Sequence, residues 1–283
     1  MSDAPTTPCG TCGICCRSYV VPVNGYDIWL ISTRERLNPE EFIVAYPLPK
    51  KNAESFHLSK DGFNCALALA KKGEFAIERD CTFLVQLGGG HARCGIYEHR
   101  PGACRTYPMT LFRNAVIQRK DSRCPPNAWS EEAKRWPSWR VSLKRMDMTF
   151  DVYHEVVARW NARVDQSPEG TTYPLTTYLN YLMNVYDRLG QLDAQLGEEA
   201  LARVRENWAA LPEHGDLSDE SVNHDQYPWV TYLSAAREII DEFYPDVASQ
   251  VSIALLRATA NQGTDPPRHL IPDDVWEAAG AKG

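Results

Sequence analysis

The downstream half of the chain carries a long helical pattern of apolar positions. Between residues 139 and 164 the apolar residues recur at alternating spacings of four and three, which places them on one face of a helix. Shorter stripes of the same kind over 182–196, 229–243 and 247–258 predict three further amphipathic helices. We therefore expect a helical bundle or layer whose Trp and Tyr residues lie in the core. The longest stripe consists of Trp139, Leu143, Met146, Phe150, Tyr153, Val157, Trp160 and Val164.

The upstream half predicts short mixed elements joined by loops. Its apolar stretches are brief and are separated by Asn, Pro and Gly, a pattern typical of strands and capped helices connected by turns. The triple glycine at 88–90 predicts a hairpin turn, because it lacks the strand and helix that frame a phosphate-binding loop. The expected strands cover residues 19–23, 56–69, 75–77 and 82–85, and the expected helix starts are Asn24 or Asp27 and Asn38-Pro39.

These patterns divide the chain near residue 125 and predict an α+β fold that is mainly α. Residues 1–125 are expected to form a small irregular domain with short strands, and residues 126–283 an α-helical bundle. Charge divides at the same place, because residues 1–125 hold 16 Lys and Arg against 12 Asp and Glu, whereas residues 126–283 hold 14 against 25. The upstream half is therefore basic by four charges and the downstream half acidic by eleven.

The overall composition argues against several classes of protein. With 43% hydrophobic and 24% charged residues, the chain has an ordinary globular composition. Its net charge of −7 and its scattered basic residues argue against nucleic-acid binding. No apolar run approaches the roughly 18–20 residues of a membrane span, and residues 1–7 lack the basic and apolar regions of a secretory signal. We expect a cytoplasmic protein that binds neither membrane nor nucleic acid; the pattern does not indicate an oligomeric state.

All nine cysteines lie in the first 124 residues. In a reducing compartment, thiols brought together in this way are metal ligands or redox groups, and an odd number also argues against a complete disulfide framework. Four of them fall in the single run Cys9-Gly10-Thr11-Cys12-Gly13-Ile14-Cys15-Cys16.

This cysteine run indicates a metal site without fixing the metal. Three thiolates from one short loop, with a remote cysteine followed by proline, hold a [4Fe–4S] cluster in bacterial ferredoxins, and Cys124 is followed by Pro125. The same loop also fits a zinc knuckle, since structural zinc takes four such ligands in a tetrahedron. A disulfide between the adjacent Cys15 and Cys16 would be strained. The first gap in the run is wrong for a radical-SAM cluster loop.

The remaining cysteines complete a family pattern. The run C-x-x-C-x-x-C-C is followed by C-x-F-L from Cys81, C-x-I-Y from Cys94 and R-P-x-x-C-R-x-Y-P around Cys104. In this order, over about residues 9–125, the motifs resemble the YkgJ-type cysteine-cluster proteins. These are described as zinc- or iron-chelating, and flagellin lysine N-methylases share their cysteine pattern.

The resemblance implies a set of metal ligands and a cofactor. Eight thiolates exceed one tetrahedral site, so either two metals or clusters are held or some cysteines are not ligands. The likeness to the methylases favours a [4Fe–4S] cluster over zinc, and Cys65 matches no motif position and is expected to be a small buried side chain. The implied ligands are Cys9, Cys12, Cys15, Cys16, Cys81, Cys94 and Cys104, with Cys124 as an eighth.

Arg100 and Arg105 flank Cys104 and are the candidate cofactor-binding residues. They could supply positive charge and hydrogen bonds to the thiolates. Alternatively, Arg100 could hold a turn through a backbone carbonyl and Arg105 could pair with a surface acid. His91 and His99 are further candidates for zinc, although the thiolates are sufficient without them.

The first interpretation of function is therefore an iron–sulfur protein, with a [4Fe–4S] cluster used in redox or methyl-transfer chemistry. No catalytic residue can be named, because the sequence contains no SAM-binding glycine loop, catalytic triad or paired carboxylates. One alternative is a non-enzymatic zinc- or iron-chelating module whose acidic helical half binds a protein partner. Another is a thiol redox sensor that uses Cys15 and Cys16 or a C-x-x-C pair.

Overall fold

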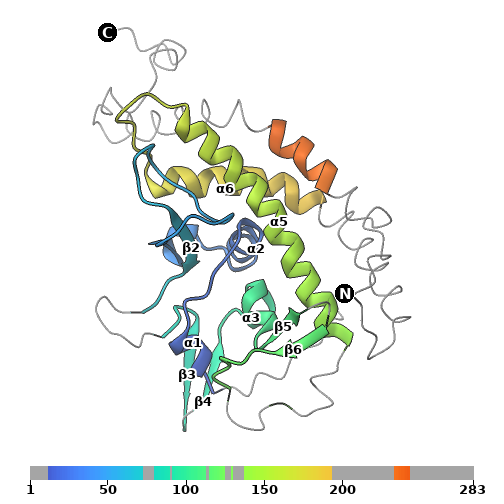
Figure 1. The fold of residues 1–283 in the computed structure, drawn as a ribbon. Coiled ribbons are helices and arrows are strands. Elements are labelled where there is room, and N and C mark those ends of the chain that lie inside the picture. The colour runs from blue at the N-terminus through green and yellow to red at the C-terminus, as the bar shows by residue number, and fades with distance from the viewer. Residues whose placement is uncertain are drawn as a thin grey trace.

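The structure is a computed structural model that describes residues 12–72, 80–89, 91–112, 115–124, 129, 137–192 and 233–242. It confirms the predicted α+β class, with short antiparallel strand pairs upstream and long helices downstream (Figure 1). The predicted strand at 75–77, the predicted helix at 247–258 and the candidate ligand Cys9 lie outside the described residues.

The described strands form three separate antiparallel pairs. Gly88 and Gly89 form the predicted turn between β3 and β4, and both have positive φ angles, of 83° and 58°, that favour glycine. The strand expected at 19–23 is reduced to one bridge between Pro22 and Ala68, with hydrogen bonds from the Val23 N–H to the Leu67 carbonyl and from the Leu69 N–H to the Val21 carbonyl. The pairs are β1 (Ile43–Pro47) with β2 (Cys65–Leu69), β3 (Leu84–Gly88) with β4 (His91–Cys94), and β5 (Met109–Phe112) with β6 (Ala115–Gln118).

The first predicted helix is confirmed as α2 (Gly25–Glu35), and it begins with a capping box. The Asn24 side chain accepts a hydrogen bond from the Asp27 backbone N–H at 3.0 Å, and the Asp27 carboxylate accepts one from the Asn24 N–H at 3.3 Å. The start at Asn38-Pro39 produces only the 3₁₀ helix η1 (Pro39–Glu41), because the chain then extends into β1. Three more short helices lie near the cysteines: α1 (Ile14–Ser18), η2 (Tyr97–His99) and α3 (Gly102–Thr106).

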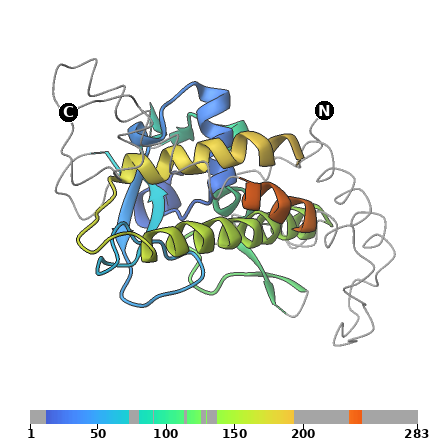
Figure 2. The same ribbon diagram turned by 90° about the horizontal axis from the view of Figure 1, so that it is seen from above.

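The long helices α5 (Pro137–Asp165) and α6 (Leu175–Leu192) follow the two longest apolar stripes. The helix α2 packs across them, and a further helix over 233–242 lies against α5 and α6 (Figure 2). Its Arg237 pairs with Glu155 of α5 at 2.8 Å, and its Glu242 pairs with Arg188 of α6 at 3.3 Å. Among the helices that the structure describes, none is long and apolar enough to cross a membrane.

Two glycines allow α2 and α6 to pack at close range. A Cβ atom at Gly25 would lie 2.0 Å from the Tyr186 ring, and one at Gly190 would lie 2.3 Å from the Trp29 ring. Each aromatic ring therefore covers the bare backbone of the facing helix, and any larger residue at either glycine would push the helices apart.

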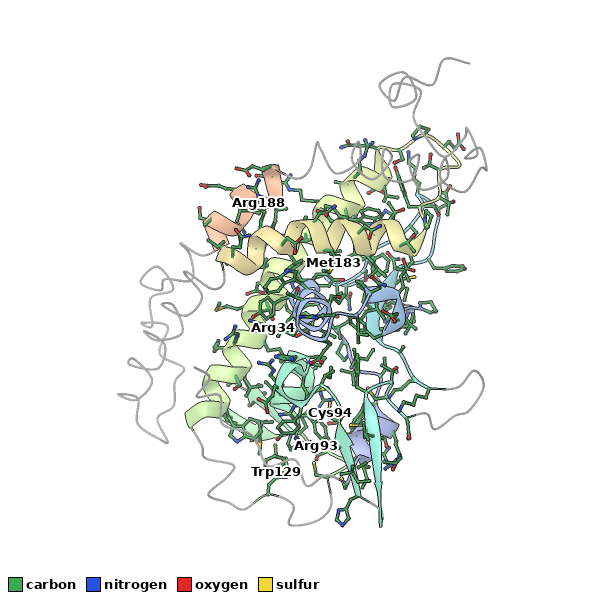
Figure 3. All side chains as sticks on the ribbon, turned by 180° about the vertical axis from the view of Figure 1, so that it is seen from behind. Arg34, Arg93, Cys94, Trp129, Met183 and Arg188 are labelled. Atoms are coloured by element: carbon green, nitrogen blue, oxygen red, sulfur yellow. The ribbon has the colours of Figure 1, made fainter. Side chains whose placement is uncertain are left out.

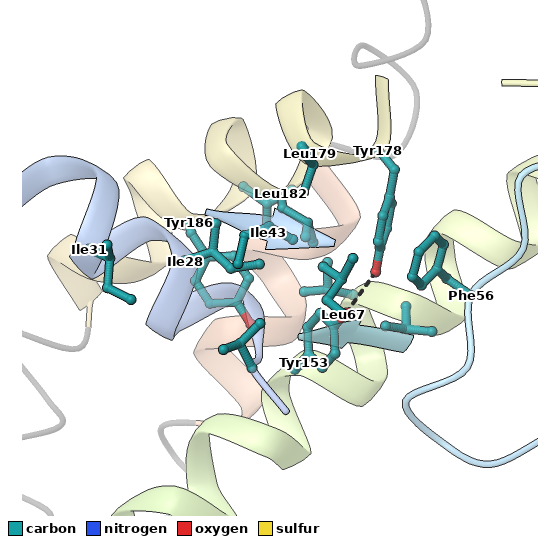
Figure 4. Close-up of a cluster of buried hydrophobic side chains, with 14 of the residues drawn as sticks. Ile28, Ile31, Ile43, Phe56, Leu67, Tyr153, Tyr178, Leu179, Leu182 and Tyr186 are labelled. Atoms are coloured by element: carbon teal, nitrogen blue, oxygen red, sulfur yellow. Dashed lines mark hydrogen bonds between the residues drawn. The ribbon is translucent and has the colours of Figure 1, made fainter. Parts of the chain in front are cut away.

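The hydrophobic core is continuous across residue 125. Phe56 and Leu67 from the upstream half pack in one cluster with Tyr153, Tyr178 and other residues from α5 and α6 (Figure 4). The Tyr153 and Tyr178 hydroxyls share a buried hydrogen bond of 3.1 Å, which satisfies both polar groups inside this cluster. The division into domains 1–125 and 126–283 stays a prediction, and the core shows that the two parts pack directly on each other.

Candidate metal centre

Four thiols from four separate segments share one neighbourhood. Cys16 lies on α1, Cys81 precedes β3, Cys94 ends β4 beneath α3 (Figure 3), and Cys104 lies on α3. Burial raises the pKa of the Cys104 thiol well above its usual range, and the charges of the other three thiols raise it further. Cysteines separated by up to 88 positions in the sequence are thus close enough to affect one another's ionisation.

Backbone hydrogen bonds bring the first three of these segments together. The Cys81 N–H donates to the Cys16 carbonyl at 3.0 Å, and the Leu84 N–H donates to the Cys81 carbonyl at 2.8 Å. Leu84 in turn is the partner of Cys94 in the β3–β4 register. The strand pair therefore fixes the positions of Cys81 and Cys94, and one main-chain bond attaches α1 to them.

Gly13 explains why α1 can approach the hairpin. It precedes the helix with a φ of 67°, a left-handed conformation that favours glycine. A Cβ atom there would lie 3.1 Å from the Cβ of Ala92 on β4. The glycine inside the cysteine run thus supports both the tight turn and the contact that brings Cys16 to β4.

Of the cysteine run, the structure describes Cys12, Cys15 and Cys16, which are all half-buried. The Cys15 and Cys16 sulfurs are 4.0 Å apart. The hydrogen bond from Cys15 lowers the pKa of Cys16 to about 7, helped by the charges of Lys71, Arg17 and Arg100 and opposed by burial. The Cys12 carbonyl accepts a hydrogen bond from the Arg17 guanidinium at 3.1 Å, which anchors the start of the run.

The remaining two of the four thiols lie in a less favourable environment for charge. Burial raises the pKa of Cys94 to about 11, with further increases from the Cys16 and Cys81 thiolates. Burial also raises the pKa of Cys81, although Lys71 and Lys72 oppose this change. A metal ion bound by these groups as thiolates would offset both the burial and the mutual repulsion that disfavour their ionised forms.

Arg100 and Arg105 brace the loop between Cys94 and Cys104. Arg100 donates to the Tyr97 carbonyl at 2.9 Å, and its guanidinium lies 3.7 Å from the centre of the Tyr97 ring. Arg105 donates to the carbonyls of Arg100 and Glu98 at 2.7 and 2.9 Å. The Arg100 charge also lowers the pKa of the Cys16, Cys94 and Cys104 thiols, so this residue has both a structural and an electrostatic effect.

The two histidine candidates differ in their surroundings. The His99 ring is 2.7 Å from the carboxylate of Glu35, which attaches η2 to the end of α2. His91 is exposed at the start of β4, next to the hairpin turn. Their role as zinc ligands stays a prediction.

Cys65 and Cys124 have other neighbours. Cys65 lies on β2, where its thiol donates weakly to the Phe63 carbonyl at 3.7 Å. Cys124 packs against a second apolar cluster that contains Trp129 and Trp139, and its charge raises the pKa of Tyr107. The roles of Cys124 and Cys9 as metal ligands stay predictions.

The chemistry of the donors suits zinc or iron. Cys16, Cys81, Cys94 and Cys104 offer soft thiolate ligands, the type that selects zinc and iron–sulfur centres. Within the described residues, no three His, Cys, Asp or Glu side chains are gathered closely enough to hold an ion as they stand. Binding would therefore require the thiols to close inward by side-chain rotation or by small shifts of their segments.

Sequence patterns did not identify two residues that matter here. Lys71 donates to the Cys16 carbonyl at 2.7 Å, but a lysine after a strand carries no signal of its own. Asp27 was visible as a possible helix cap, and its carboxylate also accepts a hydrogen bond from the Gly102 N–H at 2.9 Å. That second bond joins α2 to the cysteine-bearing α3 across 75 positions, which no local pattern reveals.

Comparison with known proteins supports metal chelation by this part of the chain. Residues 8–125 match the model of the CxxCxxCC family, described as a "putative zinc- or iron-chelating domain". This match confirms the resemblance seen in the cysteine motifs over the same range. No curated protein and no solved structure gives a significant match to the chain.

Proposed function

We propose that residues 8–125 hold an iron–sulfur cluster of the [4Fe–4S] type through cysteine thiolates, with Cys16, Cys81, Cys94 and Cys104 as the central ligands. The match to a zinc- or iron-chelating domain supports metal binding in general, without specifying a cluster. The observation that supports this particular set is the effect of the four neighbouring thiols, of which Cys81 is buried and the others are half-buried, on one another's ionisation. When bound, such a cluster would supply one-electron chemistry.

The charges around the thiols support a centre of net negative charge. Four thiolates around a [4Fe–4S] core carry about −2 overall. The positive side chains of Lys71, Arg17 and Arg100 all act on Cys16, and Arg100 acts on three of the four thiols. These cations would offset the charge of the cluster and raise its potential.

Two features of the sequence favour the cluster over a single zinc ion. The first is the likeness of the cysteine motifs to those of the flagellin lysine N-methylases. The second is the remote Cys124 followed by Pro125, as in the cubane-binding ferredoxins. A [4Fe–4S] cluster takes four thiolates, so ligation by Cys9, Cys12, Cys15 or Cys124 would belong to a second metal or cluster. That second centre is part of this proposal, as is the expected cytoplasmic location, where thiols stay reduced.

The decisive experiment is anaerobic purification followed by iron, sulfide and zinc analysis with absorption and paramagnetic resonance spectra. We expect brown protein that contains iron and sulfide in equal amounts and gives a paramagnetic signal after reduction or oxidation. Single changes to serine at Cys16, Cys81, Cys94 or Cys104 should each abolish the visible absorption. Cys65→Ser is the matched control and should retain it.

Two outcomes would contradict the proposal. Colourless protein with one or two zinc ions per chain would replace the cluster by a zinc site built from the same ligands. Protein that holds no metal after both anaerobic purification and reconstitution would refute metal binding. A redox or methyl-transfer reaction, and a protein partner for the acidic residues 126–283, are further parts of the proposal that rest on the sequence. The first assay measures electron transfer into the oxidised cluster and out of the reduced cluster.

A further inference from the structure

We infer that Asp27 is a positioning residue for the metal centre: its carboxylate anchors the start of α3 and so sets where the Cys104 thiol lies. This inference rests on the proposed metal site and adds a residue that belongs to none of the cysteine motifs. It also gives a physical connection between the site and the helices behind it.

The contacts of Asp27 span two helix starts. Its side chain is buried, with 5% of its surface exposed. One carboxylate oxygen accepts from the Asn24 N–H at the start of α2, and the other accepts from the Gly102 N–H at the start of α3. The residue before α3 is Pro101, which provides no side-chain cap, so Asp27 supplies the acceptor that the first N–H of α3 lacks locally.

A second set of contacts holds α3 against α5. A Cβ atom at Gly102 would lie 3.1 Å from the Met146 side chain, so the helix start fits closely against α5. At the other end of α3, the Thr106 hydroxyl donates to the Gly102 carbonyl at 2.9 Å and lies 3.4 Å from the Met146 sulfur. Cys104 is in the middle of this five-residue helix, so a shift of its start moves the thiol directly.

The buried hydrogen bonds continue from Asp27 into the downstream helices. Its capping partner Asn24 donates to the Thr149 hydroxyl on α5 at 2.9 Å, and Thr149 donates to the Met146 carbonyl at 2.9 Å. One connected group of buried polar atoms therefore joins α2, α3 and α5. The position of Cys104 relative to the other three thiols is set by this group as well as by the loop that precedes α3.

The choice of aspartate at this position supports the inference. A buried carboxylate is unfavourable unless it is well hydrogen-bonded, and a neutral amide at this third position of the α2 capping box would serve α2 alone. Only a side chain with two acceptor oxygens on opposite sides can accept from Asn24 and Gly102 together. The bridge to α3 therefore accounts for a group that the α2 cap by itself does not require.

The test uses Co²⁺ as an optical probe in the full-length metal-free protein. Thiolate-to-cobalt charge-transfer absorption per bound ion reports how many thiolates bind, and competition with a chelator gives affinity. We expect Asp27→Ala to lower the affinity for Co²⁺ about tenfold or more, the usual effect of removing a residue that holds a metal ligand in place. The charge-transfer absorption per bound ion should also weaken. Asp27→Asn keeps an acceptor for the Gly102 N–H and should retain most of both.

The matched control is Asn161→Ala. Asn161 is equally buried and bridges two backbone groups, accepting from the His57 N–H and donating to the Ser55 carbonyl, on the side of α5 that faces the β1–β2 region. It should lose stability without a change in the cobalt spectrum. If Asp27→Ala does not fold, Asp27→Ser takes its place, because its hydroxyl is too short to reach Gly102.

The outcomes separate this inference from the proposed function. If the wild-type protein binds no Co²⁺ through thiolates and holds no iron after anaerobic reconstitution, the metal site itself is refuted. If the wild type binds but the alanine or serine variant at position 27 has the affinity and spectrum of the control, Asp27 has no positioning role. Loss of the spectrum in Asp27→Asn to the same extent as in Asp27→Ala would also overturn the hydrogen-bond explanation.

Discussion

The buried carboxylate of Asp27 makes the stability of the protein depend on pH in a way that one substitution should remove. Burial raises the pKa of Asp27 from 3.8 to about 6, against the lowering effects of the Gly102 and Asn24 N–H groups and of the nearby arginines. A shift of about two units corresponds to about 3 kcal/mol at 1.36 kcal/mol per unit.

The direction of the effect follows from where the proton is bound. Below about pH 4, Asp27 is protonated in both states and the native state carries no penalty from it. Between about pH 4 and 6 the unfolded chain releases the proton while the native protein keeps it, so the free energy of unfolding falls as pH rises. Above the native pKa of about 6 the loss is complete and stays constant.

Urea unfolding of reduced, metal-free protein between pH 4 and 7.5 measures this directly in wild type and Asp27→Asn. The variant cannot ionise at position 27, so its free energy of unfolding relative to wild type should rise by about 3 kcal/mol across this range. Loss of one capping hydrogen bond adds a constant offset of about 1 kcal/mol against the variant. A difference that does not vary with pH would refute the reasoning, and one that varies in the opposite direction would mean that the arginines and N–H groups outweigh burial.

Three further predictions concern the helical packing. Gly190→Ala should destabilise the protein by about 1–3 kcal/mol in urea unfolding, because the new methyl group overlaps the Trp29 ring; an ordinary exposed helix position would instead gain stability from this change. Tyr178→Phe should cost about 1–3 kcal/mol by leaving the buried Tyr153 hydroxyl without its partner, and the double change to phenylalanine should recover part of that loss in a double-mutant cycle. Ile240→Ala should cost about 2–4 kcal/mol if the helix over 233–242 is held by its apolar contacts, as its 1% exposure indicates, and unchanged thermal unfolding would contradict this.

The elements that the sequence predicted well are those set by local interactions. The stripe from Trp139 to Val164 determines α5 without reference to the rest of the chain, because its period alone selects one buried face. Asn24 and Asp27 determine the start of α2 for the same reason, since a cap acts within one turn. In contrast, α3 and the β5–β6 hairpin were not predicted, because their four- and five-residue segments are too short for a periodic signal.

The cysteine motifs indicated metal binding but did not show which thiols lie together. The C-x-x-C spacing groups Cys12 and Cys15 in the sequence, whereas the structure brings Cys16 together with Cys81, Cys94 and Cys104. That grouping depends on the β3–β4 register and on the hydrogen bond between Cys81 and Cys16, which are long-range features. The bond from Asp27 to Gly102 is of the same kind, and only the folded chain reveals it.

Residues on both sides of position 125 share one hydrophobic core, and this limits how the cysteine-bearing segment can be isolated. Phe56 and Leu67 are sheltered by Tyr178 and its neighbours on α6. In a recombinant fragment ending at residue 125 these side chains would form an exposed apolar patch, and such patches promote aggregation. Experiments on the metal centre therefore require a protein that includes the downstream helices, which bury these side chains.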